Sequence, residues 1–184
     1  MGDAELSDEA LVTRCRASFD WTRETMAVLY QRHRVGLFNF LRRYVGDDHV
    51  AEDVLQETFL RVIRGIEQFE PTKRFADWIY TIALNAARDG MRRRKAVSLE
   101  PDFAPAMEAG PEERTAIRDE HEKLSRLITD LPEEERAVFI LARVEGKPLS
   151  EVADVMGFSV RTAKYRLADA LEHLTRRMAT TEAV

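Results

Sequence analysis

Along most of the chain, apolar residues recur at three- and four-residue steps, the spacing of one face of an α-helix. An early stripe predicts a long helix that ends at Gly46 and contains Met26, Leu29, Tyr30, His33, Leu37, Phe40, Leu41 and Tyr44. The next predicts a helix over about 50–66, with Val54, Leu55, Phe59, Val62, Ile63 and Ile66 facing the core. A third predicts a helix over about 75–94, with core positions Phe75, Trp78, Ile79, Ile82, Ala83 and Ala86. Because Pro71 precedes this helix, the segment before it is expected to be a loop.

The C-terminal part of the chain has the spacing of a helix-turn-helix. Asp130 and Pro132 come before three acids that suit the positive end of a helix, and this helix is expected to reach Gly146. The small Ala153 allows two helices to cross closely, and Gly157 permits a tight turn four residues later. The apolar residues expected between these helices are Val152, Met156, Val160 and Ala163. The second helix of the motif is expected over about 159–178.

The composition favours an all-α protein of two small helical domains. The chain has 184 residues with 45% hydrophobic content, and it holds only 8 Gly and 6 Pro. Between the two helical parts, residues 96–122 contain eight acids, three prolines and only two basic residues. A segment of this composition buries too little surface to fold, so a flexible acidic linker is expected there. The alternative is that these acids act as an intramolecular decoy for a DNA-binding surface.

The net charge of −5 at first argues against a nucleic-acid ligand, but the basic residues are concentrated. From Arg88 to Lys95 the chain has five basic residues against one acid, a local balance of +4. One face of the same predicted helix carries Asp77, Thr81, Asn85, Arg88 and Arg92. Short hydrogen-bonding groups followed by guanidiniums can bind bases at one end of the helix and phosphates at the other.

A second polar and basic cluster lies where the last helix of the helix-turn-helix begins. It comprises Ser159, Arg161, Thr162, Lys164, Tyr165 and Arg166. This is the end of a recognition helix that enters the major groove of duplex DNA. Asp169 follows the cluster and would repel a phosphate, so the predicted site ends at Arg166.

Several other classes of protein are disfavoured. Cys15 is the only cysteine, so an intramolecular disulfide is excluded, and the N-terminus lacks the order of a signal peptide. No apolar run is long enough to insert in a membrane, which favours a cytoplasmic protein. A metal-dependent enzyme could be built on His49, Glu52 and Asp53, but the other histidines do not complete a known motif. The sequence predicts no catalytic residue, no metal and no cofactor.

Two motifs of the first half have a family resemblance. They are Ala51-Glu52-Asp53-Val54-Leu55-Gln56-Glu57-Thr58-Phe59 and Trp78-Ile79-Tyr80-Thr81-Ile82-Ala83-Leu84-Asn85. With the helix-turn-helix that follows, the chain resembles regions 2 and 4 of the extracytoplasmic-function (ECF, group IV) sigma factors of bacterial RNA polymerase. The resemblance places region 2 at 22–95 and region 4 at 123–178. It leaves an N-terminal extension at 1–21, in which Ser7 is a plausible helix cap, and a tail at 179–184.

The resemblance also implies partners and roles. Asp53, Gln56 and Glu57 would dock on the clamp helices of the largest subunit of core RNA polymerase, and Leu60 is an apolar residue on the same polar face. The non-template strand of the minus-10 element, single-stranded after melting, would contact Lys73, Arg74, Tyr80, Thr81, Asn85, Arg88, Arg92 and Arg93. The duplex minus-35 element would contact Ser159, Arg161, Thr162, Lys164, Tyr165 and Arg166. An anti-sigma factor is a further expected partner. A stand-alone helix-turn-helix regulator is the alternative, but it leaves the first half without a role.

Overall fold

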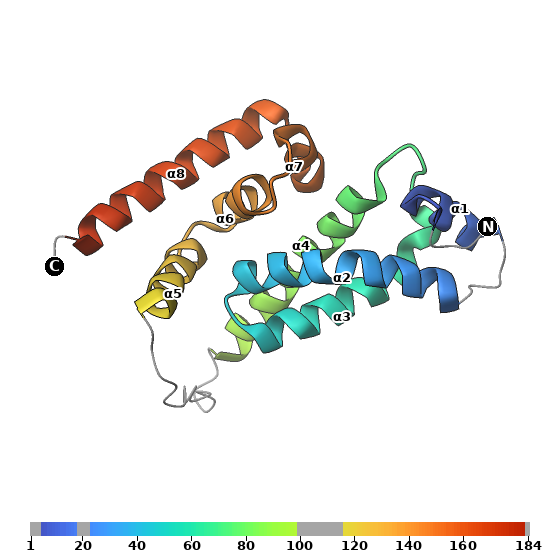
Figure 1. Ribbon diagram of the computed structural model, residues 1–184, viewed down its shortest axis with the longest axis horizontal. Helices are drawn as coiled ribbons and strands as arrows, with labels where there is room; N and C mark the ends of the chain where they lie inside the picture. Colours follow the sequence, from blue (N-terminus) through green and yellow to red (C-terminus); the bar gives the residue numbers. More distant parts are fainter. Residues whose placement is uncertain (1–4, 18–22, 99–115, 183–184) are drawn as a thin grey trace.

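The computed structural model describes residues 5–17, 23–98 and 116–182, and within these ranges it contains helices and no strand (Figure 1). The N-terminal half comprises α1 (Asp8–Ala17), α2 (Arg23–Val45), α3 (Asp48–Gly65), a 3-10 turn η2 (Ile66–Gln68) and α4 (Phe75–Ser98). The C-terminal half comprises α5 (Ala116–Thr129), α6 (Glu133–Phe139), a π turn η3 (Ile140–Val144), α7 (Leu149–Met156) and α8 (Val160–Glu182). The predicted all-helical fold is confirmed.

The connection between α2 and α3 follows from two adjacent residues. Gly46 has a φ of +77°, a left-handed conformation that glycine adopts without steric cost, and its N–H donates to the Arg42 carbonyl at 2.9 Å. The Asp47 carboxylate then accepts a hydrogen bond from the Val50 N–H at 2.8 Å and caps α3. Since only these two residues join the helices, α2 and α3 pack side by side.

Apolar side chains of α2, α3 and α4 form the core of the N-terminal half. The Phe40 ring stacks on Tyr44 at 5.7 Å between centroids and meets Tyr80 of α4 edge-on at 5.4 Å. Other fully buried members are Leu29, Leu37, Leu41, Val62, Ile79 and Ala83. At the start of α4, α1 packs across the same core through Leu11 and Val12.

Two side chains of the predicted apolar stripes lie nearer the surface. Ile63 is 44% exposed, so its assignment to the core was wrong, whereas Val62 and Ile66 beside it are fully buried. α3 contacts α2 on one flank and α4 on the other, and Ile63 falls outside the arc that these two helices cover. Tyr30 is 41% exposed, although its ring still contacts Phe59 edge-on at 4.7 Å.

The helix-turn-helix has its predicted geometry. Gly157 ends α7 with a φ of +67°, and the Phe158 N–H donates to the Ala153 carbonyl at 2.9 Å. Val152, Met156 and Ala163 are buried as predicted, whereas Val160 is 51% exposed at the start of α8. The helix expected to run to Gly146 widens into η3, where the Glu145 N–H donates to the Ile140 carbonyl. This turn brings Glu145 and Lys147 towards the N-terminal half.

The two halves pack against each other, which the expectation of two flexibly tethered domains did not include. α7 lies against α4, while α5 and η3 lie against α2 (Figure 1). Apolar residues of both halves belong to one continuous core, and Arg136 Nη1 donates to the Tyr44 carbonyl at 2.9 Å across the boundary. The ends of the expected linker are helical, because α4 continues to Ser98 and α5 begins at Ala116. The rest of the expected linker, 99–115, lies outside the described residues.

Candidate polymerase and nucleic-acid interface

The outer face of α3 carries the residues expected to bind polymerase. Asp53, Gln56 and Leu60 are exposed and Glu57 is half-buried, while Val54 and Phe59 on the opposite side of the helix are buried. Arg61 Nε donates to Glu57 Oε1 at 2.8 Å, and this hydrogen bond holds the pKa of Glu57 below its ordinary value. Glu57 is therefore ionised and held in place, and the four residues share one accessible surface, called here the α3 face.

A groove between α2 and α3 adjoins the α3 face. It is lined by Tyr30, Arg34, Val35, Phe38, Glu52, Leu55 and Gln56. The exposed part of Tyr30 and the exposed Val35 give this groove an apolar wall beside charged groups. No sequence pattern predicted the groove, because its walls come from two helices whose facing residues are separated by about one helix length in the chain.

The residues expected to bind the minus-10 strand differ in their accessibility. Asn85 in the middle of α4 and Arg92 and Arg93 near its C-terminal end are exposed. Tyr80, by contrast, is only 7% exposed, and burial raises the pKa of its hydroxyl above the ordinary value. Lys73 is exposed in the loop before α4, where Lys73 Nζ pairs with Glu70 at 3.1 Å. Lys73, Asn85, Arg92 and Arg93 are therefore accessible to DNA in this arrangement, and Tyr80 is not.

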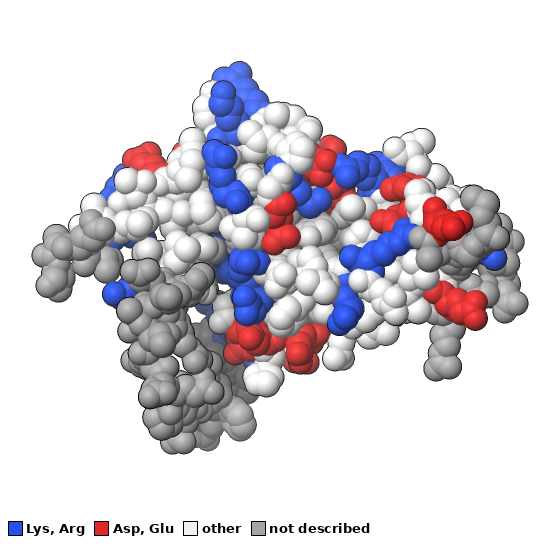
Figure 2. All heavy atoms as spheres, in the orientation of Figure 1, with Lys and Arg blue, Asp and Glu red and all other residues white. Residues whose placement is uncertain are grey.

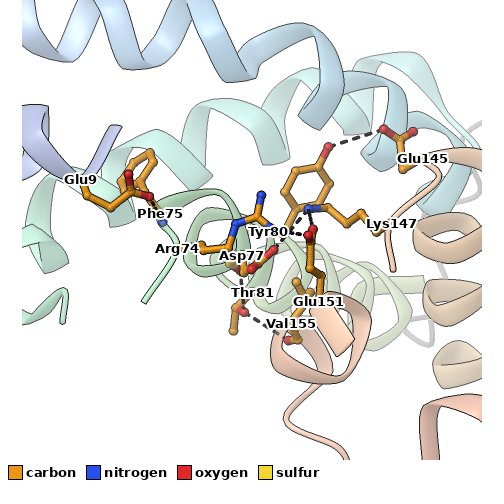
Figure 3. A network of polar contacts seen from close by, with 10 residues as sticks. All are labelled: Glu9, Arg74, Phe75, Asp77, Tyr80, Thr81, Glu145, Lys147, Glu151 and Val155. Atoms are coloured by element: carbon orange, nitrogen blue, oxygen red, sulfur yellow. Dashed lines mark hydrogen bonds and ion pairs between the residues drawn. The ribbon is translucent and has the colours of Figure 1, made fainter. Parts of the chain in front are cut away.

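The C-terminal half covers Tyr80 and the part of α4 around it (Figure 3). Lys147 Nζ lies 3.2 Å from Asp77 Oδ1 and 3.4 Å from Glu151 Oε2, and it sits 4.7 Å above the centre of the Tyr80 ring. The Tyr80 hydroxyl lies 3.5 Å from Glu145 Oε2. We call Asp77, Tyr80, Glu145, Lys147 and Glu151 the interdomain network.

Three further contacts flank the interdomain network. Thr81 Oγ1 donates to the Val155 carbonyl of α7 at 3.1 Å, and it also lies 2.9 Å from the Asp77 carbonyl. Arg74 pairs with Glu151, and Arg88 Nε donates to Glu133 Oε1 at 2.6 Å. Four of the residues expected to bind DNA, Arg74, Tyr80, Thr81 and Arg88, thus have partners in the C-terminal half. Their partners gave no signal in the sequence, since each lies 45 to 77 positions away.

The residues expected to bind the minus-35 duplex gather at the start of α8. Ser159 Oγ accepts a hydrogen bond from the Thr162 N–H at 3.1 Å and so caps the helix. The Arg161 guanidinium lies over the Tyr165 ring, 5.5 Å from its centre, and Tyr165 is 56% exposed. In Figure 2 basic side chains gather at the top of the view, where α8 begins beside α7. This end of α8 projects from the molecule.

Arg166 differs from its neighbours in this cluster. Its Nε lies 3.0 Å from Glu134 Oε2 of α6, and its Nη1 lies 3.9 Å from Asp169 Oδ2. Two acids thus compete with phosphate for this guanidinium. Lys164, which lies between Arg161 and Tyr165 in the sequence, is exposed.

The described ranges offer neither a metal-binding cluster nor a membrane span. Within them, no three His, Cys, Asp or Glu side chains come together in a way that could hold a metal ion. None of the helices in those ranges combines the length and the apolar character needed to cross a bilayer.

Comparison with known proteins places this geometry in a family. The family model for sigma-70 region 2 matches residues 29–97, which include α3 and nearly all of α4, and the model for sigma-70 region 4 matches residues 121–174. The RNA polymerase sigma factor CarQ of Myxococcus xanthus is 34% identical and aligns over 84% of this chain and 90% of CarQ. The ECF RNA polymerase sigma factor SigE of Mycolicibacterium smegmatis is 31% identical over 89% of this chain and 66% of SigE.

Solved structures share the fold. CnrH, in complex with the cytosolic domain of CnrY, has a TM-score of 0.72 at 24% identity, covering 94% of this chain and 97% of CnrH. The sigma factor RpoE of Bartonella quintana, in complex with the anti-sigma factor NepR, has a TM-score of 0.63 at 20% identity over 82% of this chain and 96% of RpoE. A stand-alone helix-turn-helix regulator is not favoured, because region 2 is present as well. The protein belongs to the ECF sigma factors of the sigma-70 family, which recognise promoters for RNA polymerase.

Proposed function

We propose that the α3 face binds core RNA polymerase through its largest subunit. The support is the exposure of Asp53, Gln56 and Leu60 together with the fixed, ionised carboxylate of Glu57. An apolar residue within a polar face is a common composition for a protein-binding surface. The chain would then lend promoter specificity to the polymerase in the cytoplasm without performing a chemical step of its own.

The two forms of promoter DNA would bind two separate faces of the chain. The loop 69–74 and the outer side of α4 would bind the unpaired minus-10 strand, with Asn85, Arg92 and Arg93 reachable at once. The start of α8 would bind the minus-35 duplex, with Arg161 and Lys164 exposed for base edges and phosphates. Melting costs a few kcal/mol per base step, and binding of the extruded bases would recover that cost.

The observation that carries the proposal is this combination of faces in one chain. A polar α3 face, a cationic end of α4 and a basic start of α8 lie on separate helices, and each is accessible in part. Tyr80, Thr81 and Arg88 become available to DNA only after the C-terminal half leaves α4, because each now contacts that half. We therefore infer that minus-10 binding is coupled to separation of the two halves.

An anti-sigma factor is the further partner that we propose. Two structures of similar fold are complexes, one with the cytosolic domain of CnrY and one with the anti-sigma factor NepR. The groove between α2 and α3 offers an apolar wall next to the α3 face, so an anti-sigma segment bound there would compete with polymerase for Gln56. Pull-down with core polymerase in the presence and absence of a co-expressed candidate would test this competition.

In vitro transcription with core polymerase and a promoter library tests the main proposal. Gln56→Ala should weaken polymerase binding, Asn85→Ala should reduce use of the minus-10 element, and Arg161→Ala should reduce use of the minus-35 element. Glu172→Ala is the matched control, since Glu172 lies on an exposed part of α8, 2.7 Å from Arg176 of the same helix. If the purified chain bound polymerase without changing the position of the transcription start, the proposed function would be refuted.

A further inference from the structure

The N-terminal helix α1 lies outside both regions that match the family models, yet it is tightly integrated in the fold. Leu11 and Val12 are fully buried, and Cys15 is nearly so. Ser7 Oγ accepts a hydrogen bond from the Ala10 N–H at 3.2 Å and caps the helix. A solvent-exposed extension would not bury these three side chains, so α1 has a defined place in the fold.

The loop between η2 and α4 is a short exposed turn with buried ends. Phe69 and Phe75 are both buried, and their rings meet edge-on at 5.8 Å between centroids. Between them, residues 70–74 are exposed, and the Lys73 N–H donates to the Glu70 carbonyl at 2.9 Å. The shape of this loop therefore depends on how its two ends are held.

α1 holds both ends by hydrogen bonds to the backbone. Arg16 Nη1 donates to the Phe69 carbonyl at 3.0 Å, and Glu9 Oε1 accepts from the Phe75 N–H at 3.0 Å (Figure 3 for Glu9). The first N–H groups of a helix have no partner within the helix, and a carboxylate there also meets the positive end of the helix dipole. Glu9 thus caps α4 from another helix, and Arg16 fixes the other end of the loop two turns further along α1.

α1 is itself anchored on α2. Asp8 Oδ1 lies 2.7 Å from Arg32 Nη1, and Asp8 Oδ2 lies 2.7 Å from His33 Nε2. The His33 ring in turn contacts Phe75 edge-on at 5.4 Å. Glu9 and Arg16 therefore project from a rigid support, which lets them define the position of the loop.

We propose that α1 is a positioning element that holds the 69–74 loop, through Glu9 and Arg16, in the shape that binds an unpaired base of the minus-10 strand. This proposal rests on the proposed function of that loop. Glu9 and Arg16 are positioning residues, since their hydrogen bonds are made to backbone groups of Phe75 and Phe69 rather than to DNA. A loop that is ordered before binding loses less conformational freedom when the base enters it.

The test uses the full chain and a pool of fluorescent single-stranded 12-mers randomised at every position, with selection followed by sequencing. Glu9→Ala and Arg16→Met should weaken binding of the sequences selected by the parent about tenfold, the effect of losing one such hydrogen bond. They should also flatten the base preference at one position of the selected sequences. Glu9→Gln keeps an acceptor oxygen and should lie closer to the parent. Glu5→Gln and Arg14→Met are controls that remove the same charges from the same segment.

Four outcomes are distinguishable. Loss of affinity with a flattened preference at one position supports the positioning role, even with the small fall in melting temperature that loss of a helix cap brings. Parent-like affinity and preference in both variants overturns the role of α1 while leaving the DNA-binding function intact. An equal loss for every sequence, in proportion to a lowered melting temperature, reduces α1 to a structural element and also overturns the proposal. A parent chain that selects no sequence, either alone or bound to core RNA polymerase, refutes the function of the loop itself, and the role of α1 with it.

Discussion

Replacement of Lys147 by methionine tests whether the closed arrangement limits DNA binding. Lys147 Nζ lies between Asp77 and Glu151 and above the Tyr80 ring. Asp77 is only 8% exposed, so Lys147→Met leaves a nearly buried carboxylate without its cation in the closed arrangement. When the halves separate, the same carboxylate becomes solvated, and the loss of Lys147 then costs little.

The magnitude follows from the burial of the pair. Removal of one partner of a well-buried, hydrogen-bonded ion pair costs several kcal/mol, and a partly solvated pair costs less. For side chains that are 12% and 11% exposed, we expect the closed arrangement to lose roughly 2 to 3 kcal/mol relative to the open one. Since 1.4 kcal/mol is a factor of ten, the ratio of open to closed molecules should rise by about 30- to 150-fold.

Two measurements on the free, full-length chain report the change. Small-angle X-ray scattering should give a larger radius of gyration for Lys147→Met. Fluorescence anisotropy with the single strand selected by the parent should show tighter binding, because the apparent affinity is the intrinsic affinity multiplied by the open fraction. Loss of a positive charge would by itself weaken binding to DNA, so the expected direction is opposite to a simple charge effect.

Two controls accompany this variant. Lys147→Arg keeps the charge and should stay closed, and Lys123→Met removes a charge from an exposed position of α5. Unchanged scattering together with unchanged or weaker single-strand binding by Lys147→Met would refute the reasoning. Binding to minus-35 duplex should be retained, which separates opening of the two halves from unfolding of the C-terminal half.

Three other predictions follow from local geometry. Gly157→Ala should lower the free energy of unfolding by about 1 kcal/mol, because Gly157 has a φ of +67°. Gly90→Ala, inside α4 with Val54 Cγ2 at 3.7 Å from the added Cβ, should raise it by about 0.5 to 1 kcal/mol. The urea unfolding midpoints of the two variants should therefore shift in opposite directions. Burial raises the pKa of Glu145 despite Arg43, Tyr80 and Lys147 nearby, so the folded state favours the protonated carboxyl. The stability that this protonated form contributes is lost as the pH rises through the raised pKa. Glu145→Gln should therefore be more stable than the parent at pH 8, and the difference should shrink as the pH falls towards the ordinary glutamate value of 4.5. Parent-like melts at all pH values would contradict this. Tyr165→Ala removes an exposed ring paired with Arg161. It should weaken binding of the minus-35 duplex about tenfold in electrophoretic mobility shifts and leave single-strand binding unchanged. Equal losses on both DNAs would count against the assignment.

The sequence alone determined the helices, their main boundaries and the family. The apolar periodicity and the left-handed glycines at 46 and 157 are local properties, because a helix is defined by residues within a few turns of one another. The motif around Gln56 and the helix-turn-helix are equally local, so the family resemblance can be recognised from the sequence alone. The exposure of Asp53 and Gln56 also followed from helical periodicity.

The packing of the two halves, by contrast, sets which of the predicted DNA-binding residues are accessible. Tyr80 and Glu145 are 65 positions apart, and Glu9 and Phe75 are 66 positions apart. No spacing rule links such pairs, because their proximity depends on how whole helices pack through many apolar side chains. The closure of the C-terminal half over α4 and the support of the 69–74 loop by α1 both arise in this way, from the summed packing of helices and not from any short motif.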